Sequence, residues 1–241
     1  MEKAYKLLAV QENISNSQAK QLIDDGLVFV AGKQIKIARA DVNPKSRFVV
    51  SYVEKIEKIF EDDKIIAVNK PSSVVSESLE KKFNAKLLHR LDKGTSGVLV
   101  LVKDEEFRLK AIEEFRNQRV YKEYIAIVSG IISEEMVIDD PIKTSKDKKA
   151  KSIISPHGQS ARTEIFPLEI SGKRTKIKAI IATGRTHQIR VHLSHIAHPI
   201  LGDTQYGGMS ASRIMLHSNR IKIFHYDLTA NEPEEFKKFF S

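Results

Sequence analysis

Short apolar runs separated by polar turns dominate the hydrophobic pattern and predict more strands than helices. In the larger part of the chain, runs typical of buried strands occur at Ile65–Val68, Val98–Val102, Tyr124–Val128, Thr163–Phe166 and Ile177–Ala182. These runs do not alternate regularly with helical segments, as they would in a doubly wound sheet. The pattern therefore predicts an α+β fold.

Two helices are predicted among these strands. Asp104 can cap a helix that runs to Arg116, because apolar residues recur within it at four-residue spacing. A second helix is expected from Thr186 to Ala197, where Thr186 can supply the capping oxygen.

The first 53 residues predict a small α/β module. Ser17 can cap a helix from Gln18 to Asp25 that Gly26 ends. Short strands are expected at Leu27–Val30, Lys33–Ile37 and Phe48–Val50. We expect a linker at residues 54–63, followed by a larger domain at residues 64–241.

Composition narrows the classes of function. The chain of 241 residues carries a net charge of +9, which favours a polyanionic partner such as RNA. Because it contains no cysteine, disulfides, thiolate metal sites and cysteine nucleophiles are excluded. The N-terminal residues contain no apolar signal region, and no stretch of 18 apolar residues occurs, so we expect a cytoplasmic protein without a membrane partner.

Polar residues crowd the approach to one predicted core strand. In the segment His89–Gly97, Asp92 stands between a cation-rich side and a small-residue turn that leads into Val98–Val102. An ion-paired turn that caps the strand is one interpretation. A functional site on a loop held by a rigid scaffold is the other.

A second polar group follows the predicted strand Ile177–Ala182. Gly184 allows a tight turn, and the helix after it would project His187 and Arg190 from one side. Arg190 on its own could form a surface ion pair. Two such groups in one chain favour a shared cleft. Tyr124 opens a third apolar strand, where a tyrosine more often belongs to the core than to a catalytic site, and Asn69–Pro71 is another polar cluster at a strand end.

Four histidines lie close together at positions 187, 192, 195 and 198. A metal-dependent hydrolase is the alternative that they suggest, but no acidic residue lies among them to complete a zinc site. A helix polar face and backbone capping explain them better, so we expect no metal.

Four segments, in this order, resemble the RluA-type pseudouridine synthases, which isomerise uridines in ribosomal or transfer RNA: Asn69–Pro71, His89–Gly97, Lys122–Tyr124 and Thr183–Leu193. A later segment, His198–Gly207, is also similar, and the resemblance spans about residues 60–227. It implies a mixed, largely antiparallel sheet with flanking helices and a central cleft. It also implies an isomerase that requires no cofactor.

The first 53 residues resemble the S-four-type RNA-binding module that often precedes this domain. The chain departs from the usual pattern at Asn16, where arginine is common, and at Ala31, where asparagine is common. In the larger domain, Ser72 and Ser73 replace a small residue and a glycine.

The resemblance also implies roles for individual residues. Asp92 is the essential carboxylate, and Arg190 is the cation that pairs with it, with Arg185 as the alternative. Tyr124 would stack on the target base. Arg90 would occupy the position that the flipped uridine vacates. The residues expected to contact RNA are Arg90, Arg185, Lys70, His187, Lys33, Lys20, Lys148 and Lys149.

The RNA substrate is expected to be ribosomal RNA of the large subunit, with transfer RNA as the alternative. No obligate protein partner is evident from the sequence. A non-catalytic RNA-binding or ribosome-assembly factor would share the charge and the N-terminal module, and it differs from an enzyme only in lacking activity.

Overall fold

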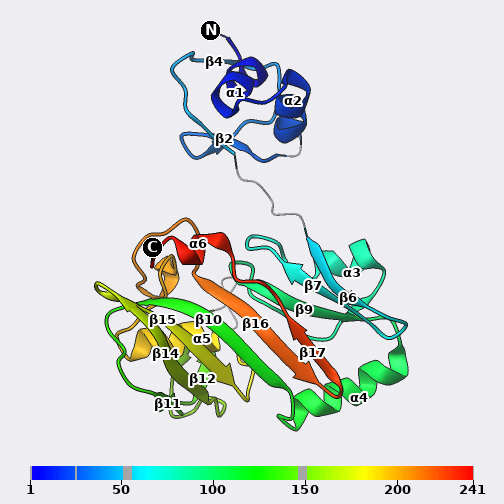
Figure 1. Cartoon of the computed structure of the whole chain (residues 1–241), viewed down its shortest axis with the longest axis vertical. Coiled ribbons are helices and arrows are strands. Elements are labelled where there is room, and N and C mark those ends of the chain that lie inside the picture. The colour runs from blue at the N-terminus through cyan, green and yellow to red at the C-terminus, as the bar shows by residue number, and fades with distance from the viewer. Residues whose placement is uncertain (1, 25, 51–55, 146–150, 241) are drawn as a thin grey trace. The chain divides into compact units, whose positions relative to one another are not determined.

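A computed structural model describes residues 2–24, 26–50, 56–145 and 151–240. The chain divides into two compact units, Met1–Glu54 and Lys55–Ser241 (Figure 1). Each is described by itself.

Unit 1 contains two helices and two small sheets. Helices α1 (Ala4–Glu12) and α2 (Asn16–Asp24) pack on a three-stranded antiparallel sheet with the order β3 (Lys33–Gln34), β2 (Val28–Val30) and β5 (Phe48–Val50). Strands β1 (Glu2–Lys3) and β4 (Asp41–Val42) form a separate pair. Leu8, Ile23 and Phe48 are buried in a core of its own.

Two expectations for this unit were wrong. Helix α2 is capped by Ser15 and not by Ser17: Ser15 Oγ accepts from Gln18 N at 3.2 Å, and Gln18 Oε1 accepts from Ser15 N at 2.9 Å. This reciprocal capping box starts the helix earlier than predicted. The second predicted strand is also shorter, since β3 ends at Gln34.

Unit 2 is built on a ten-stranded sheet. The main order is β11 (Met136–Ile138), β14 (Thr163–Ser171), β15 (Arg174–Ile181), β10 (Tyr121–Ser129), β16 (Leu216–Ile223), β9 (Ser96–Val102), β7 (Ile65–Lys70) and β6 (Glu57–Glu61). Strand β17 (Tyr226–Thr229) pairs with β16, and β8 (Lys86–Leu87) pairs with β9. All pairs are antiparallel except β16 with β9, which confirms the mixed, largely antiparallel sheet.

The five predicted strands of this unit are confirmed as β7, β9, β10, β14 and β15, and each begins or ends at least two residues beyond the predicted bounds. Residues 57–61 of the expected linker instead form β6, which pairs with β7. A separate hairpin consists of β12 (Ile142–Thr144) and β13 (Ser152–Ile154).

Both faces of the sheet are covered. Along β9, Leu99 and Leu101 belong to one buried cluster, and Val98, Val100 and Val102 belong to another, as expected for a strand buried on both sides. Helix α4 (Glu105–Arg116) packs on the second face, and Asp104 Oδ1 caps it by accepting from Phe107 N at 2.6 Å.

The other face is covered by the three remaining helices, α3 (Ser78–Phe83), α5 (Gln188–His195) and α6 (Glu234–Lys237). A short 3-10 helix, η1, spans Thr204–Tyr206. Within the described ranges, the helices are too short or too polar to span a membrane.

Strands β9 and β16 meet at Gly97, directly after the segment that contains Asp92. Gly97 has φ +113°, and a Cβ at this position would lie 2.1 Å from the carbonyl oxygen of Ser218. Glycine is therefore required here both by the backbone conformation and by the close approach of β16.

Gly97→Ala should lower the free energy of unfolding by about 3 kcal/mol or more, because it adds backbone strain and a clash with main chain. Gly172→Ala is the control: Gly172 also has a positive φ, of +58°, but nothing lies within 4 Å of its Cβ position. That change should cost only about 1–2 kcal/mol. Urea unfolding measures both, and equal losses would contradict the role of the close approach.

Candidate active site

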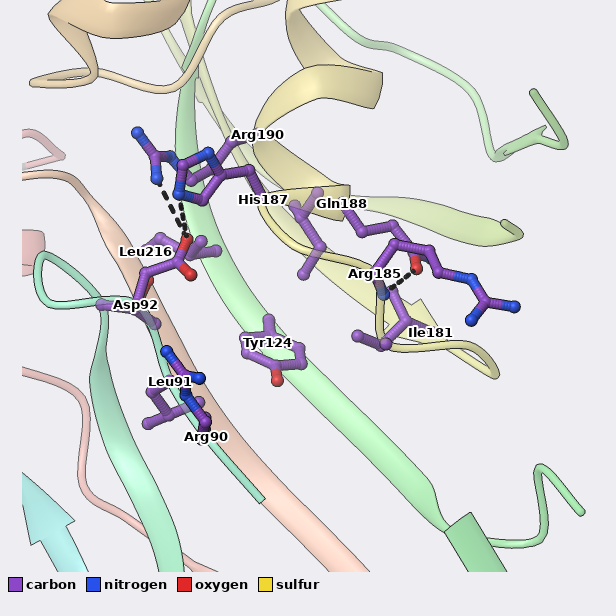
Figure 2. Close-up of a pocket in the computed structure, with 13 residues that line it drawn as sticks. Arg90, Leu91, Asp92, Tyr124, Ile181, Arg185, His187, Gln188, Arg190 and Leu216 are labelled. Carbon is purple, nitrogen blue, oxygen red and sulfur yellow. Dashed lines mark hydrogen bonds and ion pairs between the residues drawn. The ribbon is translucent and has the colours of Figure 1, made fainter. Parts of the chain in front are cut away.

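Three of the family-like segments, His89–Gly97, Lys122–Tyr124 and Thr183–Leu193, contribute residues to one cleft of about 90 Å³ in unit 2 (Figure 2). The loop before β9 contributes Asp92, strand β10 contributes Tyr124, the turn from β15 into α5 contributes Arg185 and His187, and α5 contributes Arg190. Residues from three distant parts of the sequence thus line one space.

Asp92 and Arg190 form the ion pair at the centre of the cleft. Arg190 Nη1 lies 3.0 Å from Asp92 Oδ2. The Arg190 side chain is only 6% exposed, whereas that of Asp92 is 27% exposed and faces the cleft. The carboxylate is therefore accessible to a ligand, while the guanidinium is held inside the protein.

Asp203, which was not predicted, anchors Arg190 from the other side. Its two carboxylate oxygens accept from Arg190 Nε at 2.6 Å and from Nη2 at 2.9 Å, and its side chain is buried. Burial disfavours the charge on Arg190. The contacts with Asp203, and then with Asp92, outweigh the effect of burial and raise the pKa of Arg190. The only sequence signal for Asp203 was its place in the family-like segment His198–Gly207.

Arg185 does not pair with Asp92. Its Nε donates to the carbonyl of Ser160 at 3.0 Å, and Figure 2 shows its guanidinium pointing away from the carboxylate. Of the two arginines considered for the pair, the structure places Arg190 against Asp92.

The turn before α5 is fixed by Gln188. Its Oε1 accepts from Thr183 Oγ1 at 2.8 Å and from Arg185 N at 3.0 Å. The expected cap by Thr186 was wrong, because α5 begins only at Gln188 and His187 occupies the N-cap position.

Lys122, on β10, also binds the turn between β15 and α5. Its Nζ donates to the carbonyls of Ala182 and Thr183, both at 3.1 Å. Burial, and then the nearby charge of Arg185, lowers the pKa of Lys122 to about 8. The sequence indicated Lys122 only as part of the Lys122–Tyr124 motif and did not predict its contacts with this turn.

Tyr124 is buried and lines the cleft on the side of Asp92 (Figure 2). Burial, together with the charge of Asp92, raises the pKa of its hydroxyl to about 12. The hydroxyl is therefore protonated at neutral pH and can donate a hydrogen bond.

Lys70 is fully buried, so the expectation that it contacts RNA was wrong. Its Nζ donates to the carbonyls of Pro71 and Val74, both at 2.9 Å, with Lys93 O at 3.5 Å. The sequence predicts an RNA contact for this lysine because a charged residue in a family motif gives no sign of its burial. In the fold it instead ties the turn after β7 to the loop that carries Asp92.

The other cations expected to contact RNA are placed as follows. Arg90 lines the mouth of the cleft with its side chain 74% exposed, and it pairs with Glu77 at 2.8 Å. Lys20 and Lys33 belong to unit 1, where Lys20 Nζ lies 4.6 Å from the Tyr5 ring centroid and Lys33 is exposed. Lys148 and Lys149 lie outside the described residues.

The clustered histidines contact protein groups. His192 bonds Thr163 Oγ1 and the carbonyl of Asp140, and His198 bonds the carbonyl of Ser129. His187 faces Asp92 and Tyr206. In the described part of the chain, no group of three or more metal-ligating side chains comes together.

Comparison with known proteins gives consistent matches. A family model described as RNA pseudouridylate synthase matches residues 64–195. A relative from Helicobacter pylori strain J99, described as an uncharacterized RNA pseudouridine synthase, is 53% identical over 98% of this chain and 100% of its own length. The ribosomal large subunit pseudouridine synthase D of Pasteurella multocida is 30% identical over 80% of this chain and 69% of its own length.

Among solved structures, human RNA pseudouridylate synthase domain containing 1 is similar with a TM-score of 0.67. It is 28% identical, and the match covers 77% of this chain and 86% of the human one.

Lys70→Met should lower the free energy of unfolding by about 1–3 kcal/mol at pH 7.5, since it leaves the carbonyls of Pro71 and Val74 without a donor. Burial, and then the charge of Arg213, lowers the pKa of Lys70 from 10.5 to about 8. Between pH 8 and 10.5 the unfolded chain therefore binds more protons at Lys70 than the folded protein does. The stability of the wild type relative to the variant should rise across that window.

Urea unfolding of both proteins at pH 7.5 and pH 9.5 tests this expectation. Contributions common to both proteins, including that of Lys122, cancel in the difference. A difference that shrinks at pH 9.5 would contradict the burial of a charged Lys70.

Proposed function

Because this chain belongs to the RNA pseudouridylate synthase family, we propose that it converts specific uridines of large-subunit ribosomal RNA to pseudouridine, with Asp92 as the essential carboxylate. The observation that carries this proposal is the Asp92–Arg190 pair, with an accessible carboxylate held by a buried guanidinium. A carboxylate that is fixed by a guanidinium and open to a cleft is suited to covalent catalysis.

Arg190 holds the carboxylate of Asp92 in place through the 3.0 Å contact between Nη1 and Oδ2. Asp92 can attack the anomeric carbon of the sugar, add to the pyrimidine ring or remove a sugar proton. Each of these routes requires the ionised carboxylate.

Tyr124 supplies the surface on which the uracil ring stacks. Its ring borders the cleft next to Asp92, so that a stacked base would place its glycosidic bond near the carboxylate. Because its hydroxyl is protonated at neutral pH, Tyr124 can also carry a proton in the reaction.

A uridine within folded RNA must be extruded before it reaches Asp92, at a cost of roughly a few kcal/mol. Arg90 stands two residues from Asp92, at the mouth of the cleft, and its guanidinium is exposed. An arginine there can occupy the vacated position in the RNA once it leaves Glu77. Arg185, whose guanidinium points out of the site, is suited to a phosphate contact.

The RNA class and the role of unit 1 follow from similarity. Two relatives, at 30% and 33% identity, are named ribosomal large subunit pseudouridine synthase D. Unit 1, which has a core of its own, would act as an S-four-type RNA-binding module. Lys20 and Lys33 would contact phosphates from that unit.

Asp92→Asn should lower turnover by about 10³-fold or more, because the amide cannot act as a nucleophile or a base. The fold should be retained, since Asp203 still neutralises Arg190. Release of tritium from carbon 5 of labelled uridine in ribosomal RNA measures turnover, and RNA affinity should stay within about twofold.

Asp227→Asn is the matched control, because Asp227 is an exposed carboxylate that is ion-paired with Arg220 and does not line the cleft. It should leave turnover unchanged. Turnover near the wild-type value in Asp92→Asn would remove Asp92 from the mechanism.

Lys20→Ala and Lys33→Ala should each weaken RNA binding and reduce the slope of log affinity against log salt by about 0.7–0.9, the value for one lost phosphate contact. Turnover at saturating RNA should not change, because neither residue lines the cleft. Filter binding between 50 and 200 mM salt measures the slope. An unchanged slope in both variants would contradict RNA binding by unit 1.

A further inference from the structure

Tyr206 joins three elements beside the cleft, and nothing in the role of Asp92 described above uses it. Its ring centroid lies 5.0 Å from the guanidinium carbon of Arg190. Its hydroxyl lies 2.9 Å from His187 Nδ1 and accepts from the backbone N–H of Ser152, on β13, at 2.9 Å. Tyr206 itself is buried. It therefore fixes two cleft residues relative to the β12–β13 hairpin.

His187 is held in an uncommon conformation. Its φ of +56° lies in the left-handed region, which residues with a side chain seldom adopt and which often marks a functional position. This conformation directs the imidazole into the cleft. Nδ1 meets Tyr206, and Nε2 lies 3.7 Å from Asp92 Oδ2 (Figure 2).

The surrounding groups indicate where the single proton of a neutral imidazole lies. Burial lowers the pKa of His187; Asp92 opposes the shift, Arg190 adds to it, and Asp203 opposes it. If Nδ1 carried the proton, the lone pair of Nε2 would face the Asp92 carboxylate. The single proton of the Tyr206 hydroxyl has two acceptors within reach, His187 Nδ1 at 2.9 Å and the carbonyl of Ser152 at 3.1 Å. Donation to Nδ1 is favoured, because it turns Nε2–H, and not a lone pair, toward Asp92.

Both groups that face the carboxylate approach the same oxygen. Arg190 Nη1 lies 3.0 Å and His187 Nε2 lies 3.7 Å from Oδ2. No described residue forms a hydrogen bond with Oδ1, which turns toward the side of the cleft where Tyr124 lies (Figure 2). The two oxygens of Asp92 are therefore not equivalent.

We propose, on the basis of the proposed role of Asp92, that His187 and Tyr206 are positioning residues for this carboxylate. Tyr206, fixed by Ser152, orients the imidazole. The imidazole and Arg190 together hold Oδ2, which leaves Oδ1 as the oxygen that reacts with the uridine. A 3.7 Å contact in the free protein can shorten when the substrate closes the site.

Two substitutions separate this role from simple packing. Tyr206→Phe keeps the ring against Arg190 but removes the hydroxyl. His187→Asn keeps an amide near the position of Nδ1, tolerates the positive φ and removes Nε2. Each should lower the single-turnover rate of tritium release at saturating RNA about tenfold, with RNA affinity within about twofold of the wild type.

The double variant decides whether the two residues act together. If Tyr206 acts through His187, the double variant should be no slower than the slower of the two single variants. Losses that multiply, a wild-type rate in Tyr206→Phe, or a loss confined to RNA affinity would each overturn the proposal.

Thr175→Val is the control for stability. It removes a buried hydroxyl that donates to Gly130 O at 2.9 Å and accepts from Ile132 N at 3.0 Å, and Thr175 does not line the cleft. It should lower the melting temperature and leave the rate within about twofold.

A measurement without RNA tests the same arrangement independently. The ¹⁵N chemical shifts of His187 should show the proton on Nε2 in the wild type and lose that preference in Tyr206→Phe. A proton on Nδ1 in the wild type would overturn the proposal. A wild type that releases no tritium would instead contradict the proposed function alone.

Discussion

The site depends on one buried guanidinium that must be neutralised from two sides. Removing the charge of Arg190 from water is costly unless several hydrogen bonds compensate. Asp203 provides two of them and is itself buried, so it holds Arg190 in place before any substrate binds. Asp92 then accepts a hydrogen bond from Nη1, the remaining nitrogen of a guanidinium that is already fixed. The accessible carboxylate is thereby oriented by the protein and not by its own loop alone.

The loop of Asp92 is in turn held by main-chain contacts on both sides. Lys70 binds carbonyls of the turn after β7, and Ser76 Oγ donates to Leu91 O and accepts from Leu91 N. Beyond the loop, Gly97 permits β9 to approach β16. A loop so constrained can keep a carboxylate within hydrogen-bond reach of Arg190, which lies 98 residues away along the chain. Preorganisation of this kind is what electrostatic catalysis requires.

Sequence predicted those parts of the molecule that have a local signature. The apolar runs of β9 and β10 and the cap at Asp104 were found because periodicity and capping act within a few residues. Asp203 and Tyr206 were missed, since their importance lies in contacts with α5 and β13 that no local pattern reports. The error at Lys70 has the same origin: charge predicts exposure, and only tertiary structure shows that carbonyls surround the ammonium.

The departures of this chain from the family pattern illustrate how such contacts absorb local strain. Ser73 stands where a glycine is usual, and its φ is +71°, a conformation that costs a residue with a side chain about 1–2 kcal/mol. The turn is tied to the loop of Asp92 by two hydrogen bonds: Ser73 N donates to Lys93 O at 2.7 Å, as the backbone of a glycine would, and Ser72 Oγ donates to Gly94 O at 3.0 Å and helps to offset that cost. Both acceptors directly follow Asp92 in the chain. The serine pair therefore preserves the turn and adds a side-chain bond to the loop that carries the carboxylate, one that a residue without a polar side chain could not provide.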